Sequence, residues 1–334
     1  MIRSVHPLWA VEGGQIVVSG DGIGVDPPAP VRIGGELARP VHLTPGSISV
    51  VVPAGLEGGR TPVRLGDVPG ETAFIDVGAP LAGGLHLVDS PAFDASGNLY
   101  VTFSGSRGQQ APISLFVVRP DGAREPFAGE VSNPTSMAFD RQGALYVSSR
   151  FEGTVHRITP DGTVSTFATD LGVPCGIAFA PDGALYVGDR SGSILRIEDG
   201  RSTMRLMASV PPSVAAYHLA FGPDGFLYFT GPTLATRDPV YRLSPDGDVE
   251  TFYDGFGRPQ GLAFDEHGRL YVVEALAGAS GVYRFEMDRK EPPQAVVLGG
   301  KLIGLAFDPL GGVVFSSNEA VYRLAVPLKP LRTR

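Results

Sequence analysis

The chain has 334 residues, a mass of 35.0 kDa, a formal net charge of −8 and a pI near 5.3. This length favours more than one domain, because single hydrophobic cores rarely grow past about 250 residues. The acidic balance argues against nucleic acid as a partner. No apolar run reaches the roughly 18 residues of a transmembrane helix, so no membrane span is expected. The single cysteine, Cys175, excludes an internal disulfide and a cysteine-based zinc site.

Glycine (45) and proline (30) together make up about 22% of the chain, against a usual value near 12%. So many helix breakers predict an all-β protein of short strands joined by turns. Residues 1–78 show alternating apolar segments separated by glycine-rich turns, which predicts a small β-sandwich. Its expected strands are Gln15–Ser19, Val31–Ile33, Ile48–Val52, Pro62–Leu65 and Thr72–Val77. We expect this sandwich to add little to the core of the region that follows.

A short linker is predicted at residues 79–84, and a repeat occupies residues 85–326. The dipeptide Ala-Phe recurs six times at spacings of 40–46 residues, beginning at Ala92-Phe93 and ending at Ala306-Phe307. In five copies a tyrosine follows seven residues after the phenylalanine, and the sixth copy has Val314 there. Each of the first five copies reads as four short antiparallel strands, and this period of about 40 residues predicts a six-bladed β-propeller.

The sixth copy ends at Val326 without a fourth strand. We expect Leu85–Val88 to supply this strand and so close the ring, which would remove an exposed sheet edge. Residues 327–334 are interpreted as a C-terminal tail.

Residues 1–78 resemble an IPT/TIG immunoglobulin-like domain, on the segments Val5-His6-Pro7, Glu12-Gly13-Gly14, Ile33-Gly34-Gly35 and Glu57-Gly58-Gly59. The resemblance implies a spacer or interaction module.

The repeats resemble the six-bladed propellers of the gluconolactonase (senescence marker protein) and NHL-repeat families. The shared pattern is Pro-x-Gly-(Leu/Ile)-Ala-Phe-x-x-x-Gly-x-Leu-Tyr-Val, which is complete from Pro174 and from Pro259. This resemblance implies the fold but says little about function, because propellers host many unrelated activities.

The residues just before the first strands should meet on one face of the ring, and we call them the mouth positions. They are Asp89, Thr135, Cys175, Tyr217, Gln260 and Ile303. Arg150, Arg190 and Glu274, at the ends of second strands, should form a rim on the same face. Longer loops on that face also point to binding there.

Gluconolactonases of this type hold a divalent cation in the channel with Glu, Asn and Asp. Asp89 matches the first ligand position, with Asp in place of Glu, and Ca²⁺ would be the ion to consider there. The other mouth positions supply no second carboxylate. We therefore expect no cofactor and no metal site.

The expected ligand site comprises Asp89 as the catalytic or orienting carboxylate, with Thr135, Cys175, Tyr217, His218 and Gln260 around it. Cys175 with His218 as its base is a second hypothesis for catalysis, whereas a buried apolar role for Cys175 is the simpler interpretation.

Three functions stay open. The first is a propeller that binds a small polar molecule or a protein partner. The second is a gluconolactonase-like enzyme that hydrolyses a lactone or a related cyclic substrate. The third is a structural spacer. A monomer is expected. The first 25 residues contain no signal-peptide pattern, which favours a cytoplasmic location, with a secreted or periplasmic one if a leader has been removed.

Overall fold

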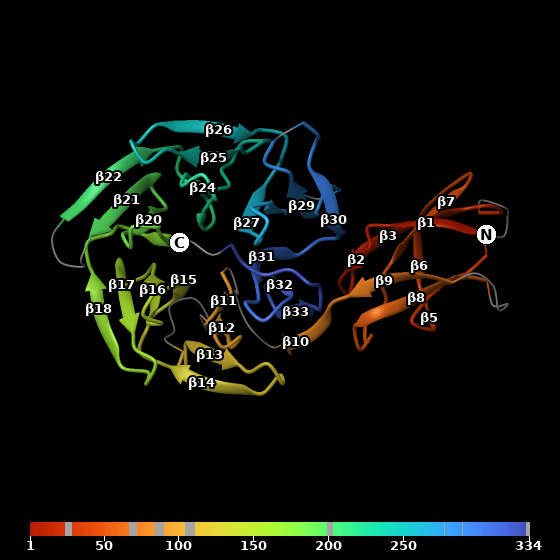
Figure 1. Cartoon of the computed structure of the whole chain (residues 1–334), viewed down its shortest axis with the longest axis horizontal. Helices are drawn as coiled ribbons and strands as arrows, with labels where there is room; N and C mark the ends of the chain where they lie inside the picture. Colours follow the sequence, from red (N-terminus) through yellow and green to blue (C-terminus); the bar gives the residue numbers. More distant parts are fainter. Residues whose placement is uncertain are drawn as a thin grey trace.

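A computed structural model describes residues 1–23, 29–66, 72–83, 90–103, 111–198, 203–276, 278–288 and 290–331. Every regular element in these ranges is a β-strand, so the chain is all-β, as predicted. A smaller N-terminal part lies beside a ring of four-stranded sheets (Figure 1). Across the described ranges, no helix has the length and apolar character needed to cross a bilayer.

The N-terminal part consists of two sheets that share one core. The first sheet contains β1 (Ile2–His6), β3 (Gln15–Gly20), β6 (Arg39–Thr44) and β7 (Ser47–Val51). The second contains β2 (Trp9–Ala10), β4 (Val31–Ile33), β5 (Glu36–Leu37), β8 (Gly59–Leu65) and β9 (Thr72–Val77). Alternate residues such as Ile16, Val18 and Val63 are buried between them, because successive side chains of a strand point to opposite faces. The five predicted strands are confirmed to within three residues at each end.

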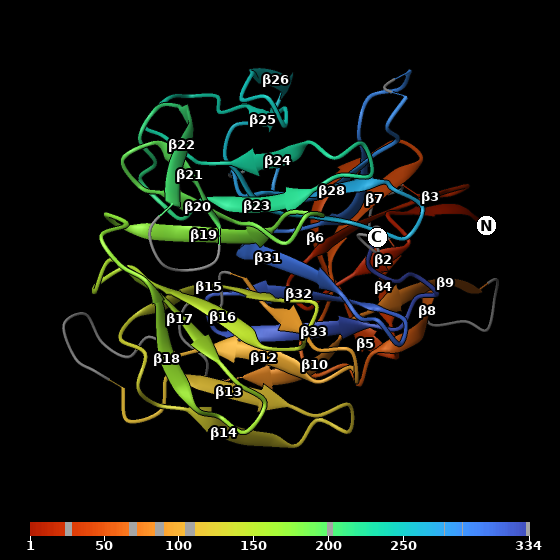
Figure 2. The ribbon, with the colours of Figure 1, turned by 60° about the vertical axis from the view of Figure 1, so that its left-hand side comes forward.

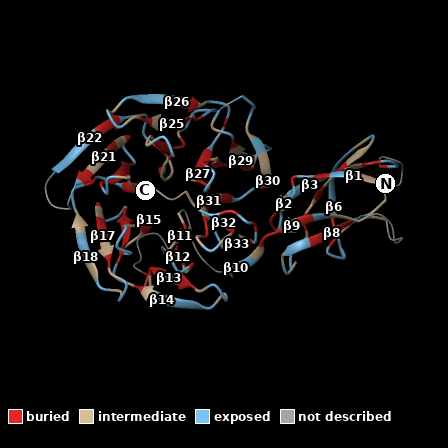
Figure 3. Cartoon of the chain, viewed as in Figure 1, coloured by how far each residue is buried: buried red, intermediate tan, exposed pale blue. Residues whose placement is uncertain are grey.

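Repeats one to five each contribute four antiparallel strands, the unit of a propeller, and the sixth contributes three. The first sheets are β11 (Ala92–Phe93), β12 (Leu99–Thr102), β13 (Leu115–Val118), β14 (Arg124–Ala128); β15 (Pro134–Phe139), β16 (Leu145–Ser149), β17 (Thr154–Ile158), β18 (Val164–Ala168); and β19 (Pro174–Phe179), β20 (Leu185–Asp189), β21 (Ser193–Glu198), β22 (Thr203–Ser209). The later strands are β23 (His218–Phe221), β24 (Leu227–Thr230), β25 (Val240–Leu243), β26 (Val249–Tyr253); β27 (Pro259–Phe264), β28 (Leu270–Glu274), β29 (Gly281–Phe285), β30 (Gln294–Leu298); and β31 (Leu302–Phe307), β32 (Val313–Ser317), β33 (Ala320–Leu324). The inner strands are largely buried and the outermost strands largely exposed (Figure 3).

An aspartate in the turn after the first strand explains why the repeated sequence folds as a hairpin. In the fifth repeat Asp265 Oδ1 accepts backbone N–H groups from His267 and Arg269, both at 3.0 Å. Its Oδ2 accepts the Tyr271 hydroxyl at 3.2 Å. Asp224 accepts the Tyr228 hydroxyl at 2.8 Å in the preceding repeat. The carboxylate therefore ties the turn to the second strand, as Asx-type turns do.

The repeated tyrosine and phenylalanine join neighbouring sheets. Each tyrosine contacts the phenylalanine of the next repeat edge-on, with ring centroids 4.8–5.2 Å apart. The pairs are Tyr100–Phe139, Tyr146–Phe179, Tyr186–Phe221, Tyr228–Phe264 and Tyr271–Phe307. Such T-shaped pairs stabilise beyond the burial of their area.

The last sheet is closed by a strand from upstream, but not by the predicted residues. β10 (Ala79–Gly83) pairs with β33 in antiparallel register, and the two strands lie side by side in both views (Figures 1 and 2). The linker predicted for residues 79–84 is therefore wrong as far as Gly83. The predicted closing strand, Leu85–Val88, lies outside the described residues. Ala79–Gly83 can act as the closing strand because Leu81 packs on the apolar residues at this junction, including Val321.

The N-terminal part also contributes to the core of the ring, contrary to our expectation. Val11 is buried in a cluster that includes Val297 and Val326, and Trp9 stacks on Tyr271 at a centroid distance of 6.4 Å. β3 pairs with β30 through Gln15 and Leu298, so one sheet runs from the ring into the sandwich. The two parts form one packed unit around repeats five and six.

Leu81→Asp should weaken the closure. It places a charge against the apolar junction, and we expect the free energy of unfolding to fall by about 1–3 kcal/mol, with self-association through the loosened β33 edge. Urea unfolding and light scattering measure the two effects. Pro80→Ala, an exposed change on the same strand, is the control. A Leu81→Asp protein as stable and monomeric as wild type would contradict this account of closure.

Candidate functional site

A cavity of about 320 Å³ opens where the first strands begin, and we call it the mouth cavity. Its described lining is Thr135, Arg150, Cys175, Arg190, Val214, Ala215, Ala216, Gln260, Ile303 and Asn318. Thr135, Cys175 and Gln260 each stand second in a first strand. Arg150 and Arg190 directly follow second strands. With Ile303, the structure thus brings together six of the residues predicted for this face, from four different repeats.

The charged residues of the described lining are Arg150 and Arg190. Arg190 donates from Nε to the Ser213 carbonyl oxygen at 3.2 Å and from a terminal nitrogen to Val214 at 2.9 Å, which fixes the loop that walls the cavity. No ion pair or hydrogen bond joins the half-buried Arg150 side chain to any residue in the described ranges. The mouth cavity therefore presents positive charge with an uncommitted guanidinium group.

The divalent cation implied by the gluconolactonase resemblance does not fit these residues. The oxygen ligands of the described lining are the Thr135 hydroxyl and the amides of Gln260 and Asn318. Two guanidinium groups beside them oppose a dication, which binds best to carboxylates. No group of three or more His, Cys, Asp or Glu side chains suited to a metal occurs in the part of the chain that the structure describes. Asp89, the predicted catalytic residue and possible Ca²⁺ ligand, lies outside that part.

Tyr217 does not line the mouth cavity. It is fully buried, and its hydroxyl donates to the Pro211 carbonyl oxygen at 2.6 Å. Glycines at 188 and 231 leave the room for its ring, since a Cβ on Gly231 would lie 2.2 Å from a ring carbon. Burial raises the pKa of the Tyr217 phenol well above its usual value. Its ring packs between the sheets of repeats three and four, in a cluster with Ala178 and Phe229.

Glu274 is also engaged elsewhere. Its carboxylate accepts backbone N–H groups of Gly257 at 2.7 Å, Arg258 at 2.9 Å and Leu276 at 2.6 Å. Asp189, the equivalent residue of repeat three, accepts the Val173 N–H at 2.7 Å. Both carboxylates hold loops in place. Glu274 was predicted to lie at the rim of the ligand site, but its carboxylate has a structural role.

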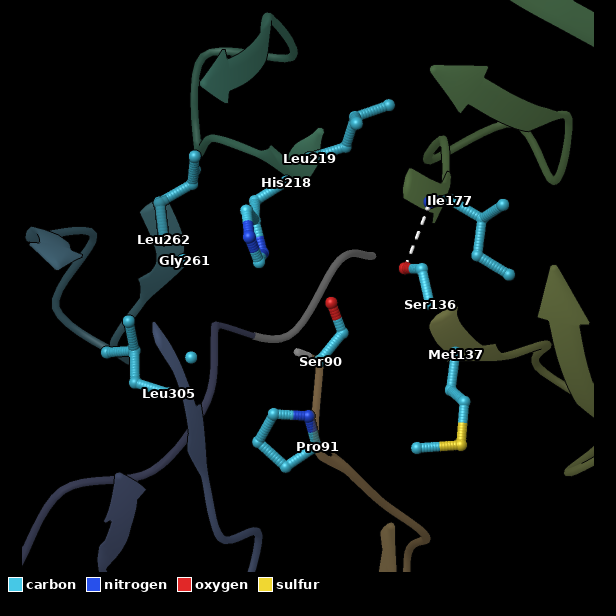
Figure 4. A pocket seen from close by; sticks show the side chains of 11 residues that line it. Ser90, Pro91, Ser136, Met137, Ile177, His218, Leu219, Gly261, Leu262 and Leu305 are labelled. Atoms are coloured by element: carbon cyan, nitrogen blue, oxygen red, sulfur yellow. Dashed lines mark hydrogen bonds between the residues drawn. The ribbon is translucent and has the colours of Figure 1, made fainter. Parts of the chain in front are cut away.

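His218 lines a second, smaller cavity of about 100 Å³, which we call the inner cavity (Figure 4). Its side chain is 4% exposed, and its Nε2 has no hydrogen-bond partner among the described residues. Burial lowers the pKa of His218 to about 4, and a hydrogen bond with the Gln260 side chain offsets only part of that lowering. The Cys175 thiol instead donates to the Val173 carbonyl oxygen at 3.2 Å. Cys175 and His218 line different cavities, which disfavours the nucleophile–base pair.

Asn318 and the 214–216 loop were missed by the sequence analysis. The repeat register contained the signal for Asn318, because it follows β32 as Arg150 follows β16 and Arg190 follows β20. The loop carries no repeat signal. It reaches the mouth through hydrogen bonds such as that from the Val214 N–H to the Pro232 carbonyl oxygen at 2.8 Å.

The fold and the cavities define a propeller-type protein with a ligand-sized opening on one face. Residues 137–299 match the SMP-30/Gluconolactonase/LRE-like region, so this part of the chain is gluconolactonase-like. No curated protein matches the sequence.

Three solved structures of propeller type are similar to the chain. A candidate gluconolactonase is 18% identical over 76% of this chain and 93% of its own, with a TM-score of 0.61. A streptogramin B lyase is 18% identical over 80% and 89%, with a TM-score of 0.56. An auxiliary nutrient binding protein from Bacteroides thetaiotaomicron is 12% identical over 96% of each chain, with a TM-score of 0.55. At these identities the likeness shows the fold alone.

Gly231→Ala tests the placement of Tyr217. The added methyl group would collide with the ring, and we expect a loss of about 1–3 kcal/mol in the free energy of unfolding. The loss should shrink in a Tyr217→Leu background, because the smaller side chain can move aside. Gly300→Ala, with no atom near the added Cβ, is the control. An equal cost of Gly231→Ala in both backgrounds would place the ring elsewhere.

The buried imidazole of His218 predicts acid sensitivity. A histidine in the unfolded chain takes up a proton near pH ~6.5, whereas His218 in the folded protein does so only near a pKa of about 4. The neutral His218 side chain therefore contributes its full stabilisation above pH ~6.5, and this stabilisation is lost as the pH falls toward 4. Between pH 7 and pH 5, wild type should lose about 2 kcal/mol more than His218→Phe in urea unfolding. Parallel pH profiles for the two proteins would show that His218 titrates normally.

Proposed function

We propose that this protein is a ligand-binding propeller whose mouth cavity binds a small polar molecule carrying a negative charge. The proposal depends on the uncommitted Arg150 side chain. It lies in a cavity whose charged residues, in the described lining, are both arginines. Arginine recognises carboxylates and phosphates through a planar fork of donors. Thr135, Gln260 and Asn318 add neutral donors and acceptors around it.

The size of the mouth cavity supports a small ligand. About 320 Å³ is at the lower end of the range for small-molecule pockets. A protein partner that presents an acidic side chain to the same cavity is the alternative occupant. The auxiliary nutrient binding protein of similar fold supports a binding role.

The finer architecture belongs to the same proposal. We infer a six-bladed ring, with the fourth strand of its last blade supplied by Ala79–Gly83. We also infer that residues 1–78 form an IPT/TIG-like immunoglobulin domain, which the two-sheet arrangement supports. Its packing against repeats five and six favours a fixed arm over a swinging one. A monomer without a resident metal is the form we propose.

A gluconolactonase-like hydrolase is the second candidate. The family match over residues 137–299 and the similar candidate gluconolactonase favour it. In this case Asp89 would act as the base or orienting carboxylate in the cleavage of a small lactone. Lactone turnover that disappears in Asp89→Asn would establish this function over simple binding.

Arg150→Gln should weaken the binding of anionic ligands. Sugar acids, lactones and other small cyclic metabolites would first be screened by thermal shift, and the acids that bind measured by calorimetry. Because a hydrogen bond to a charged group is lost, we expect Kd to rise about 10- to 100-fold for acids and to change little for neutral compounds. Arg64→Gln, an exposed arginine of the sandwich, is the control. Acids that bind Arg150→Gln as tightly as wild type would refute an anion site at this residue.

A further inference from the structure

The inner cavity is lined one residue further along the first strands than the mouth cavity. Its wall residues follow the mouth residues in sequence, as Ser136 follows Thr135 and Gly261 follows Gln260. The full described lining is Ser90, Pro91, Ser136, Met137, Ile177, His218, Leu219, Gly261, Leu262, Gly304 and Leu305. None of these described residues carries a carboxylate, an ammonium or a guanidinium group. The inner cavity therefore differs in charge from the arginine-lined mouth.

His218 supplies the unpaired polar group of this wall. Its ring extends from β23 into the cavity (Figure 4). The Ser90 hydroxyl also points into this cavity (Figure 4). The Ser136 hydroxyl is already engaged, since it accepts the Ile177 N–H at 3.1 Å. Buried polar atoms in native proteins are nearly always paired. No described residue pairs with Nε2, so this atom at the wall of a cavity is available to a ligand.

The chemistry of the imidazole restricts what that ligand can be. A neutral imidazole carries its proton on one of its two nitrogens, so the unpaired Nε2 is either an acceptor or a donor. A hydroxyl group both donates and accepts, and therefore satisfies either tautomer. Because the imidazole is neutral when buried, a charged partner gains no ion pair there.

We propose that the inner cavity is a subsite for a hydroxyl group of the ligand, with His218 Nε2 as its hydrogen-bond partner. The inference rests on the proposed function, because the other end of that ligand is the anionic group bound at Arg150. The substrate or ligand class that fits both cavities is a small hydroxy acid, with its acid group at the mouth and its hydroxyl group inside. The volume of about 100 Å³ admits one such chain end and excludes a bulky ring.

Calorimetry with matched acids tests the subsite. The probes are 3-hydroxypropionate, 4-hydroxybutyrate and 5-hydroxyvalerate, each paired with the acid that lacks the hydroxyl group. In wild type we expect at least one hydroxy acid to bind about tenfold more tightly than its partner. His218→Phe should abolish this preference, and His218→Gln, which keeps a donor and an acceptor, should retain part of it. Arg150→Gln should weaken both members of a pair equally.

A second measurement on the wild-type protein needs no variant and no anion. The ¹⁵N resonance of His218 Nε2 should shift saturably with 1,4-butanediol and stay unchanged with 1-chlorobutane, which is neutral and has no hydroxyl group. If acids fail to bind but the diol shifts His218, the proposed function is wrong and the subsite stands. If acids bind through Arg150 but show no hydroxyl preference, or one that persists in His218→Phe, the subsite is wrong and the proposed function stands. A resonance unmoved by the diol also overturns the subsite.

Discussion

The edge-on contact between a tyrosine of one repeat and the phenylalanine of the next is the interaction on which the ring depends. It recurs at five successive junctions with nearly the same centroid distance, 4.8–5.2 Å. Because the two rings come from the second strand of one sheet and the first strand of the next, the contact sets the angle between sheets. A constant angle brings residues far apart in sequence to one face. The sixth junction lacks the tyrosine, and there Val314 and Val321 pack with Leu99 and Val101 while β10 completes the sheet.

This regularity explains how far the sequence could predict the site. Once the register of the repeat was known, the residue just before each first strand was expected at the mouth. Thr135, Cys175 and Gln260 lie there, as the second residues of those strands. Arg150 and Arg190 followed from the same register. The fold class and the sandwich strands were predictable because turn residues and apolar alternation are local signals.

What the sequence could not predict depends on side-chain volume and on contacts between distant segments. Tyr217 occupies a mouth position in sequence, yet its ring lies between sheets, because Gly188 and Gly231 happen to leave room there. Glu274 has a charge suited to a site, but three backbone N–H groups already use it. The closing strand was displaced to Ala79–Gly83, since pairing with β33 depends on the packing of Leu81 and not on a local pattern.

The two faces of the ring divide structural and chemical tasks for a physical reason. On the turn face, carboxylates such as Asp265 and Asp308 are fully buried and committed to turn N–H groups and to arginines of the scaffold. A carboxylate so engaged has little capacity left for a ligand, and substituting it would loosen its own blade. On the mouth face, Asp189 and Glu274 also hold loops, but the side chains at the second position of the first strands differ from repeat to repeat. The mouth face thus presents a charged Arg150 beside the mouth cavity and a neutral His218 imidazole beside the inner cavity, and this difference in charge would orient the ligand that we propose.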